Sequence, residues 1–181
     1  MRDEGAFAQE LRRRDPEAWA RLYEEYMPKI YRYVALRVQN RMEAEDLTEQ
    51  VFLKALEAGP SFKWRGAPIS SWLFRIARNQ VIDYWRTDKS SRTLPLGESL
   101  VNDMSDPERE AEKNESIRQV IQAVGQLTQA QRDVIELRFA GGLSTAEVAR
   151  ILGKSQGAVK VMQHSALAAL RRELASWSSH E

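Results

Sequence analysis

One stretch of the sequence combines apolar side chains with groups that can bind nucleic acid. SWLFRIARNQVIDYWR, from Ser71 to Arg86, has the periodicity of a helix with apolar residues on one side. The other side carries Arg75, Arg78, Asn79, Ile82 and Arg86 at steps of three or four. Arginine neutralises phosphate, asparagine can read a base edge, and aromatic rings stack on unpaired bases. The pattern predicts a strip that faces DNA, although a solvated face with incidental charges explains this helix alone as well.

The segment before this helix places aromatic rings beside cations. Phe62, Lys63, Trp64 and Arg65 precede Gly66, a residue that tolerates irregular backbone. Aromatic rings next to Lys or Arg hold a base that has left the stack. The segment therefore predicts a base-capturing loop, and we expect at least one of its two rings to pack in the core instead.

A second candidate DNA-binding unit lies between residues 143 and 175. Ser144 with Glu147 forms a capping box, Gly153 permits a tight turn, and Ser155 can cap a second helix. This order predicts a helix-turn-helix unit whose second helix enters the major groove, with an ordinary helical hairpin as the alternative. The side chains expected to face bases and phosphates are Lys154, Ser155, Gln156, Lys160 and Gln163, with small Gly157 and Ala158 allowing close approach.

Further helices would position these units. Asp15-Pro16-Glu17 predicts a helix start, and Pro28 would kink or split that helix. A helix over 42–58 would bury Leu47, Val51, Phe52 and Leu56 and end at Gly59-Pro60. Ser70 is the expected cap of the helix that carries the basic strip. Helices resume at Pro107, and Thr128 can cap another.

Residues 87–106 are rich in turn-forming residues and have weak periodicity. They predict a linker, with an ordered surface loop inside one domain as the alternative. The predicted fold class is all-α, with two small helical domains joined by a flexible linker. The domains are expected at 1–86 and 110–176, with the linker at 87–109.

Charge and composition narrow the functional classes. The chain has no cysteine, and its two histidines lack metal-ligand spacing, so no cofactor or metal is expected. No Gly-rich phosphate loop or Ser/His/Asp set indicates an enzyme. The net charge of +1 divides into +2 over 1–90, −4 over 91–115 and +3 over 116–181. Two mildly basic blocks therefore flank an acidic segment, which fits a stretch that mimics nucleic acid in a basic channel, or a disordered one.

The segment EAEDLTEQVFLKAL opens with acidic residues: Glu43, Glu45, Asp46 and Glu49. A favourable interaction with the helix dipole explains them, and so does a face that docks on a basic protein partner. The pattern by itself leaves both interpretations open.

Three motifs together resemble a known family. EAEDLTEQVFLKAL, SWLFRIARNQVIDYWR and LSTAEVARILGKSQGAVKVMQHSALAALR match, in order and spacing, the extracytoplasmic-function (ECF) sigma factors of the sigma-70 family. The resemblance implies a sigma-2 domain and a sigma-4 domain, and a promoter-specificity subunit of bacterial RNA polymerase that promotes DNA melting. Compact inhibited and extended polymerase-bound forms would differ at residues 87–110.

The resemblance also implies three binding surfaces. The clamp helices of the polymerase beta-prime subunit would contact Asp46, Leu47, Thr48, Gln50, Val51 and Phe52. The minus-ten element would contact Lys63, Trp64, Arg65, Arg75, Arg78, Asn79, Asp83 and Arg86, and the loop Lys63–Ile69 would capture a flipped base. The minus-thirty-five element would contact Ser144, Lys154, Ser155, Gln156, Gly157, Lys160 and Gln163.

The implied partners are the polymerase core, including its beta flap, promoter DNA and an anti-sigma factor. A charged N-terminal segment and the lack of a long apolar run predict a cytoplasmic protein without direct membrane insertion. Two alternatives stay open. One is a helix-turn-helix regulator that acts on duplex DNA without core polymerase, and the other is a sigma mimic that sequesters an anti-sigma factor.

Overall fold

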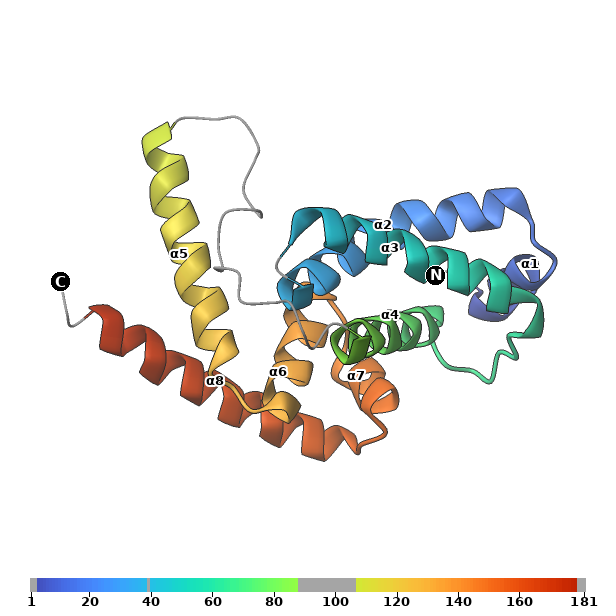
Figure 1. Ribbon diagram of the computed structural model, residues 1–181. Coiled ribbons are helices and arrows are strands. Elements are labelled where there is room, and N and C mark those ends of the chain that lie inside the picture. The colour runs from blue at the N-terminus through green and yellow to red at the C-terminus, as the bar shows by residue number, and fades with distance from the viewer. Residues whose placement is uncertain (1–2, 39, 88–106, 179–181) are drawn as a thin grey trace.

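The structure is a computed structural model that describes residues 3–38, 40–87 and 107–178. Within these ranges all regular elements are helical. The helices are α1 (Glu4–Arg12), α2 (Pro16–Val38), α3 (Arg41–Ala58), α4 (Ile69–Thr87), α5 (Pro107–Gly125), α6 (Gln129–Ile135), α7 (Thr145–Leu152) and α8 (Gln156–Ser178). A 3₁₀ turn, η1 (Gly59–Ser61), follows α3, and a π-helical turn, η2 (Glu136–Ala140), continues α6. The predicted all-α fold with two helical domains is confirmed, and Figure 1 shows α1–α4 and α5–α8 as its two groups.

The first domain forms around α2. Asp15 Oδ1 accepts hydrogen bonds from the backbone N–H of Glu17 at 2.9 Å and of Ala18 at 3.1 Å, so α2 begins where the sequence predicts. Pro28 lies inside α2, which remains one helix, so of the two predicted outcomes, a kink or a split, the split does not occur.

Two expectations about this domain are wrong. Leu56 is 38% exposed, because the buried stripe of α3 runs through Leu47, Val51 and Ala55 and leaves Leu56 to one side. Ser70 does not cap α4, because the helix already begins at Ile69.

Local signals in the second domain are confirmed. Thr128 and Gln131 form a capping box at the start of α6, and Ser144 and Glu147 form one at the start of α7. Gly153 ends α7 with φ +64°, a left-handed conformation that suits glycine. Ser155 Oγ accepts from the backbone N–H of Ala158 at 3.1 Å at the start of α8.

The two domains pack closely together. Helix α4 lies against α7, and α2 lies against η2, as Figure 1 shows for the green and orange helices at its centre. One continuous apolar core contains Phe74 and Ala77 of α4 together with Leu137 and Val148 of the second domain. The arrangement is therefore closed, with no solvent layer between α4 and α7. The predicted linker falls almost entirely on residues 88–106, which lie outside the described residues.

Candidate nucleic-acid interface

The basic strip of α4 lies along the boundary between the two domains. The Arg75 guanidinium donates to the backbone oxygen of Arg150 at 3.0 Å, and Arg78 forms an ion pair with Asp133 at 3.0 Å. Asn79, Asp83 and Arg86 are exposed, and Arg86 lies 3.8 Å from Asp83. The strip is thus polar as predicted, but the second domain already contacts two of its cations.

A buried ionic cluster supports this contact. Arg37 of α2 forms ion pairs with Asp133 and Glu136, and Gln129 Nε2 donates to Asp133 Oδ1 at 2.8 Å. The side chains of Arg37, Asp133 and Glu136 are only 8%, 7% and 2% exposed. Together with Arg78, two cations face two carboxylates across the boundary. Removing Asp133, which faces both Arg37 and Arg78, would leave an uncompensated charge in a medium of low polarity.

The surroundings change the proton affinity of these groups. Burial raises the pKa of Glu136 to about 7, although Arg37 opposes this shift. Burial would lower the pKa of Arg37, but the neighbouring Tyr33, Glu136 and Asp133 raise it above its usual value. Arg37 therefore stays charged, whereas the charge on Glu136 depends on pH near neutrality.

Other polar contacts join the domains. The Ser70 hydroxyl donates to Glu147, the residue that completes the capping box of α7. Burial tends to raise the pKa of Glu147, but hydrogen bonds from Ser144 and Ser70 lower it overall. Arg32 Nε donates to the backbone oxygen of Ala140 at 3.4 Å. The first turn of α7 is therefore tied to the first turn of α4.

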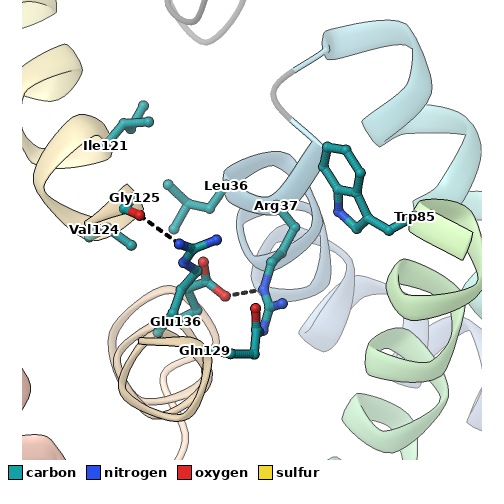
Figure 2. Close-up of a pocket in the computed structure, with 9 residues that line it drawn as sticks. Leu36, Arg37, Trp85, Ile121, Val124, Gly125, Gln129 and Glu136 are labelled. Atoms are coloured by element: carbon teal, nitrogen blue, oxygen red, sulfur yellow. Dashed lines mark hydrogen bonds and ion pairs between the residues drawn. The ribbon is translucent and has the colours of Figure 1, made fainter. Parts of the chain in front are cut away.

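A cleft of about 320 Å³ lies beside the ionic cluster. Its walls are Leu36, Arg37 and Trp85 on one side and Ile121, Val124, Gly125, Gln129, Arg132 and Glu136 on the other. Figure 2 shows Arg37 and Glu136 pointing toward one another in this cleft. The Arg132 guanidinium donates to the backbone oxygen of Gly125 at 2.6 Å. The cleft is therefore a product of the closed arrangement. The described residues contain no group of side chains that could hold a metal ion.

The loop between α3 and α4 presents one ring and buries the other. Phe62 stacks on Trp72 with ring centroids 4.4 Å apart, and both pack against the core. Trp64 is 40% exposed, and its Nε1 donates to the backbone oxygen of Ala67 at 2.8 Å. Lys63 and Arg65 are exposed beside it. The expectation that one of the two rings packs in the core is confirmed, and Trp64 is the ring left for a ligand.

Most of the residues predicted to contact the major groove lie on the surface. The exposed ones are Ser144, Lys154, Ser155, Gln156, Gly157 and Lys160. Gln163 differs, because it is half-buried and its Oε1 accepts from Arg138 Nε at 3.0 Å. The first two turns of α8 therefore form an open polar surface in the closed arrangement.

The acidic motif of α3 has one buried and one exposed face. Leu47, Thr48, Val51 and Phe52 belong to the core, and the Thr48 hydroxyl donates to the backbone oxygen of Ala44 at 2.7 Å. Asp46 and Gln50 are exposed. The four buried residues shape this face from within, and a partner would reach only the two exposed ones.

Sequence patterns missed two groups of residues, one on the exposed face of α3 and one buried between the two domains. Met42 and Leu53, 74% and 59% exposed, flank Asp46 and Gln50 on α3 at helical spacing. Asp133 and Glu136 were not identified as contacts between the domains. The sequence indicates this contact only weakly. Asp133 and Glu136 flank the apolar residues Val134 and Ile135, and Arg37, a cation that could pair with them, ends the apolar stripe of α2.

Two family models match this chain, one over each of the two domains. Residues 22–91 match sigma-70 region 2, and residues 123–172 match sigma-70 region 4. The matched regions include the basic strip and loop in the first case and the helix-turn-helix unit in the second.

Characterised relatives are similar along most of the chain. The ECF RNA polymerase sigma factor SigX of Bacillus subtilis is 32% identical over 164 residues, which cover 87% of this chain and 84% of that protein. The ECF RNA polymerase sigma factor BldN of Streptomyces coelicolor is 38% identical over 164 residues. That match covers 88% of this chain but only 61% of the relative's length.

A solved structure has a similar fold. CnrH in complex with the cytosolic domain of CnrY has a TM-score of 0.73 and 22% identity, with 96% of this chain and 97% of that chain covered. No helix within the described ranges is long and apolar enough to cross a membrane.

Proposed function

The chain belongs to the ECF RNA polymerase sigma factors of the sigma-70 family, and we propose that it directs a bacterial core RNA polymerase to specific promoters and promotes DNA melting there. The observation that carries this proposal is the pair of polar surfaces, one on α4 with its preceding loop and one on α8. We assign residues 1–86 to polymerase and minus-ten binding, 87–109 to a linker, and 110–176 to minus-thirty-five binding.

The polymerase would dock on the exposed face of α3. Asp46 and Gln50 offer carboxylate and amide groups, and Met42 and Leu53 add exposed apolar surface on the same face. Mixed apolar and acidic faces suit a basic helical partner such as the beta-prime clamp helices. The second domain would contact the beta flap.

The minus-ten element would be opened and held by the loop and α4. A base that leaves the stack would rest on Trp64, beside the cations Lys63 and Arg65. Arg75, Arg78 and Arg86 would neutralise phosphates, and Asn79 and Asp83 would contact base edges. Trapping an unstacked base offsets the few kcal/mol that unpairing costs. The chain supplies this binding energy, and the chemistry of RNA synthesis belongs to the polymerase.

The minus-thirty-five element would bind to α8. Lys154 and Lys160 would contact phosphates, Ser155 and Gln156 would face base edges, and Gly157 would allow close approach of the backbone. Ser144 at the start of α7 would contact the DNA backbone, because its oxygen accepts from the Glu147 amide and its hydroxyl hydrogen can still be donated to a phosphate oxygen.

The closed arrangement is incompatible with simultaneous use of all these residues. Arg78 is paired with Asp133, and one nitrogen of the Arg75 guanidinium donates to the backbone oxygen of Arg150, so neither can turn its full set of donors toward phosphate. We therefore propose that the closed form is inactive and that polymerase binding separates the domains, with the change of backbone taking place at residues 87–110. An anti-sigma partner would favour the closed form, because it gains by keeping Arg75 and Arg78 engaged by the second domain. A cytoplasmic location follows from the proposed partners.

Transcription in vitro tests the proposal. Core RNA polymerase is incubated with a promoter library, with and without the protein, and the transcripts are sequenced. New start sites that share two upstream elements are expected. Absence of new starts, together with tight binding of duplex DNA by the protein alone, would favour an ordinary helix-turn-helix regulator. Binding to neither polymerase nor DNA would favour a sigma mimic.

A further inference from the structure

The N-terminal helix α1 lies beside the loop that joins α3 to α4, as Figure 1 shows. Helix α1 precedes residue 22, where the match to sigma-70 region 2 begins. Phe7, Ala8 and Leu11 anchor it in the core and are at most 2% exposed. The start of α1 is thus fixed next to the proposed base-capturing loop.

One contact from α1 defines where the loop ends. The carboxylate of Glu4 accepts a hydrogen bond from the backbone N–H of Ile69 at 3.0 Å. Ile69 is the first residue of α4, and the first amides of a helix have no acceptor within the helix. A carboxylate at this end is also favoured by the helix dipole. Glu4 therefore supplies the cap that Ser70 does not, and it ties α1 to the first turn of α4.

A second contact from α1 supports the exposed ring. A Cβ atom at position 5 would lie 3.0 Å from Cζ3 and 3.3 Å from Cε3 of Trp64, so the ring rests on the bare backbone of Gly5. The other restraint on the ring is the hydrogen bond from its Nε1 to Ala67. Trp64 is thereby held in one pose while 40% of it remains exposed.

We propose that Glu4 and Gly5 are positioning residues that set the pose of Trp64 and thereby the base preference at the one promoter position that this loop captures. The proposal rests on the proposed function, because it requires that Trp64 stacks on a flipped base. Stacking depends on the pose of the ring, so a small shift of Trp64 changes which base fits best. Neither Glu4 nor Gly5 needs to touch DNA.

The test uses the full-length chain, core RNA polymerase and a library randomised in both promoter elements. Gly5→Ala introduces the Cβ atom that the ring would meet, and alanine favours helix more than glycine does, so α1 should stay folded. Glu4→Gln removes the charge at the start of α4. The control is Gln9→Ala, on the exposed side of the same helix. We expect both variants to weaken base preference at one minus-ten position by roughly three- to tenfold. Binding to core polymerase and preference in the minus-thirty-five element should match the control.

Two results would overturn the proposal. One is unchanged base preference in both variants, and the other is a uniform loss of activity at every position of both elements, which would indicate a merely structural role. If circular dichroism shows that Gly5→Ala does not fold, Glu4→Gln decides by the same criterion. A wild-type chain that yields no promoter-specific transcripts would instead contradict the proposed function, so the two failures are distinguishable.

Discussion

The two candidate DNA-binding surfaces differ in what already touches them. On α4, Arg75 and Arg78 are bound by the second domain, and Arg78 belongs to a nearly closed ionic cluster with Arg37, Asp133 and Glu136. On α8, the polar residues of the first two turns are exposed. The surface proposed to melt DNA therefore has two of its arginines engaged by the second domain, whereas the first two turns of α8 make no such contact among the described residues.

This difference has a physical basis in the two tasks. A strip that binds unstacked bases and phosphates is attractive to any strand it meets. Pairing Arg78 with Asp133 and Arg75 with the backbone oxygen of Arg150 limits premature binding. Duplex recognition by a short helix is weak on its own and becomes strong only when the polymerase adds its contacts. In the closed arrangement the second domain contacts the arginines of α4, whereas the polar residues of the first two turns of α8 stay accessible.

The largest effect is expected from locking the domains together. The chain has no cysteine, so Ser70→Cys with Glu147→Cys places a unique pair of thiols where the side chains now form a hydrogen bond. A short, cleavable thiol-reactive linker should abolish transcription, because Arg75 and Arg78 then stay engaged. Transcription from the polymerase is the measurement, and cleavage of the linker should restore it.

Each single-cysteine variant treated with the same reagent serves as the control for this locked protein. Full transcription from the locked double variant would show that the closed form is active, and the contrast between the two surfaces would lose its functional meaning.

A smaller but opposite effect is expected from Asp133→Asn. Asp133 faces both Arg37 and Arg78, so its neutralisation leaves buried positive charge without compensation and disfavours closure by about 3 kcal/mol. That corresponds to roughly a hundredfold change in the ratio of closed to open molecules. The radius of gyration from small-angle X-ray scattering should increase, while circular dichroism should keep its helical signal.

The matched control for Asp133→Asn is Glu45→Gln, which removes an exposed ion pair with Arg41. Such surface pairs contribute about 0–1 kcal/mol, so the control should keep the wild-type radius. Equal radii for Asp133→Asn and the control would mean that the apolar contacts alone keep the domains together.

Closure should also depend on pH through Glu136. Burial raises its pKa to about 7 in the closed form, and in an open form it would return toward the usual 4.5. A carboxyl with a raised pKa favours closure fully below pH 4.5, and this contribution is lost as pH rises through 7. We expect the radius of gyration to rise over this window, by a change in closure free energy on the order of 1–3 kcal/mol.

The variant Glu136→Gln tests whether the charge on Glu136 weakens or strengthens closure. The neutral amide removes the cost of burying a charge, so closure should be stronger than in the wild type at pH 8 and nearly independent of pH near 7. Arg37, Arg132, Tyr33, Asp133 and Arg78 surround this group, and burial raises the pKa of Tyr33 well above its usual value, so its hydroxyl stays neutral over the window. Weaker closure of the variant at pH 8 would show that the Arg37 ion pair outweighs burial.

Sequence patterns captured local structure well and domain packing poorly. Asp15, Thr128, Ser144 and Gly153 have roles set by neighbours within a few residues, so their chemistry alone predicts caps and turns. The engagement of Arg78 depends on Asp133, 55 residues away, and a periodic pattern carries no information at that distance. Ser70 failed as a cap for the same reason, because the acceptor came from Glu4, 65 residues earlier than Ile69.

For the candidate binding surfaces, too, local patterns predicted exposed residues better than the motif on α3 did. Trp64 and the polar turns of α8 are exposed, as a binding role requires, and they were singled out because aromatic–cation and helix-turn-helix patterns are local. On α3, the resemblance named Leu47, Thr48, Val51 and Phe52 along with the exposed Asp46 and Gln50, since a motif does not separate residues that shape a face from residues that form it. Met42 and Leu53 were missed because exposed apolar residues can be recognised only once the core is known.

The smallest effect is expected on the open surface. Lys160 is exposed on α8, and Lys160→Ala should weaken binding to a minus-thirty-five duplex by roughly three- to tenfold at moderate salt. The loss should be the same for all sequences and should reduce the salt dependence by about one ion, since a lysine–phosphate contact carries no base information. Fluorescence anisotropy of a labelled duplex over a salt series measures both quantities, with Lys54→Ala of α3 as the control. The same loss is expected in the cross-linked closed protein, because closure leaves α8 accessible. If the cross-linked protein bound no duplex at all, α8 would be guarded as well, and the distinction between the two surfaces would fail.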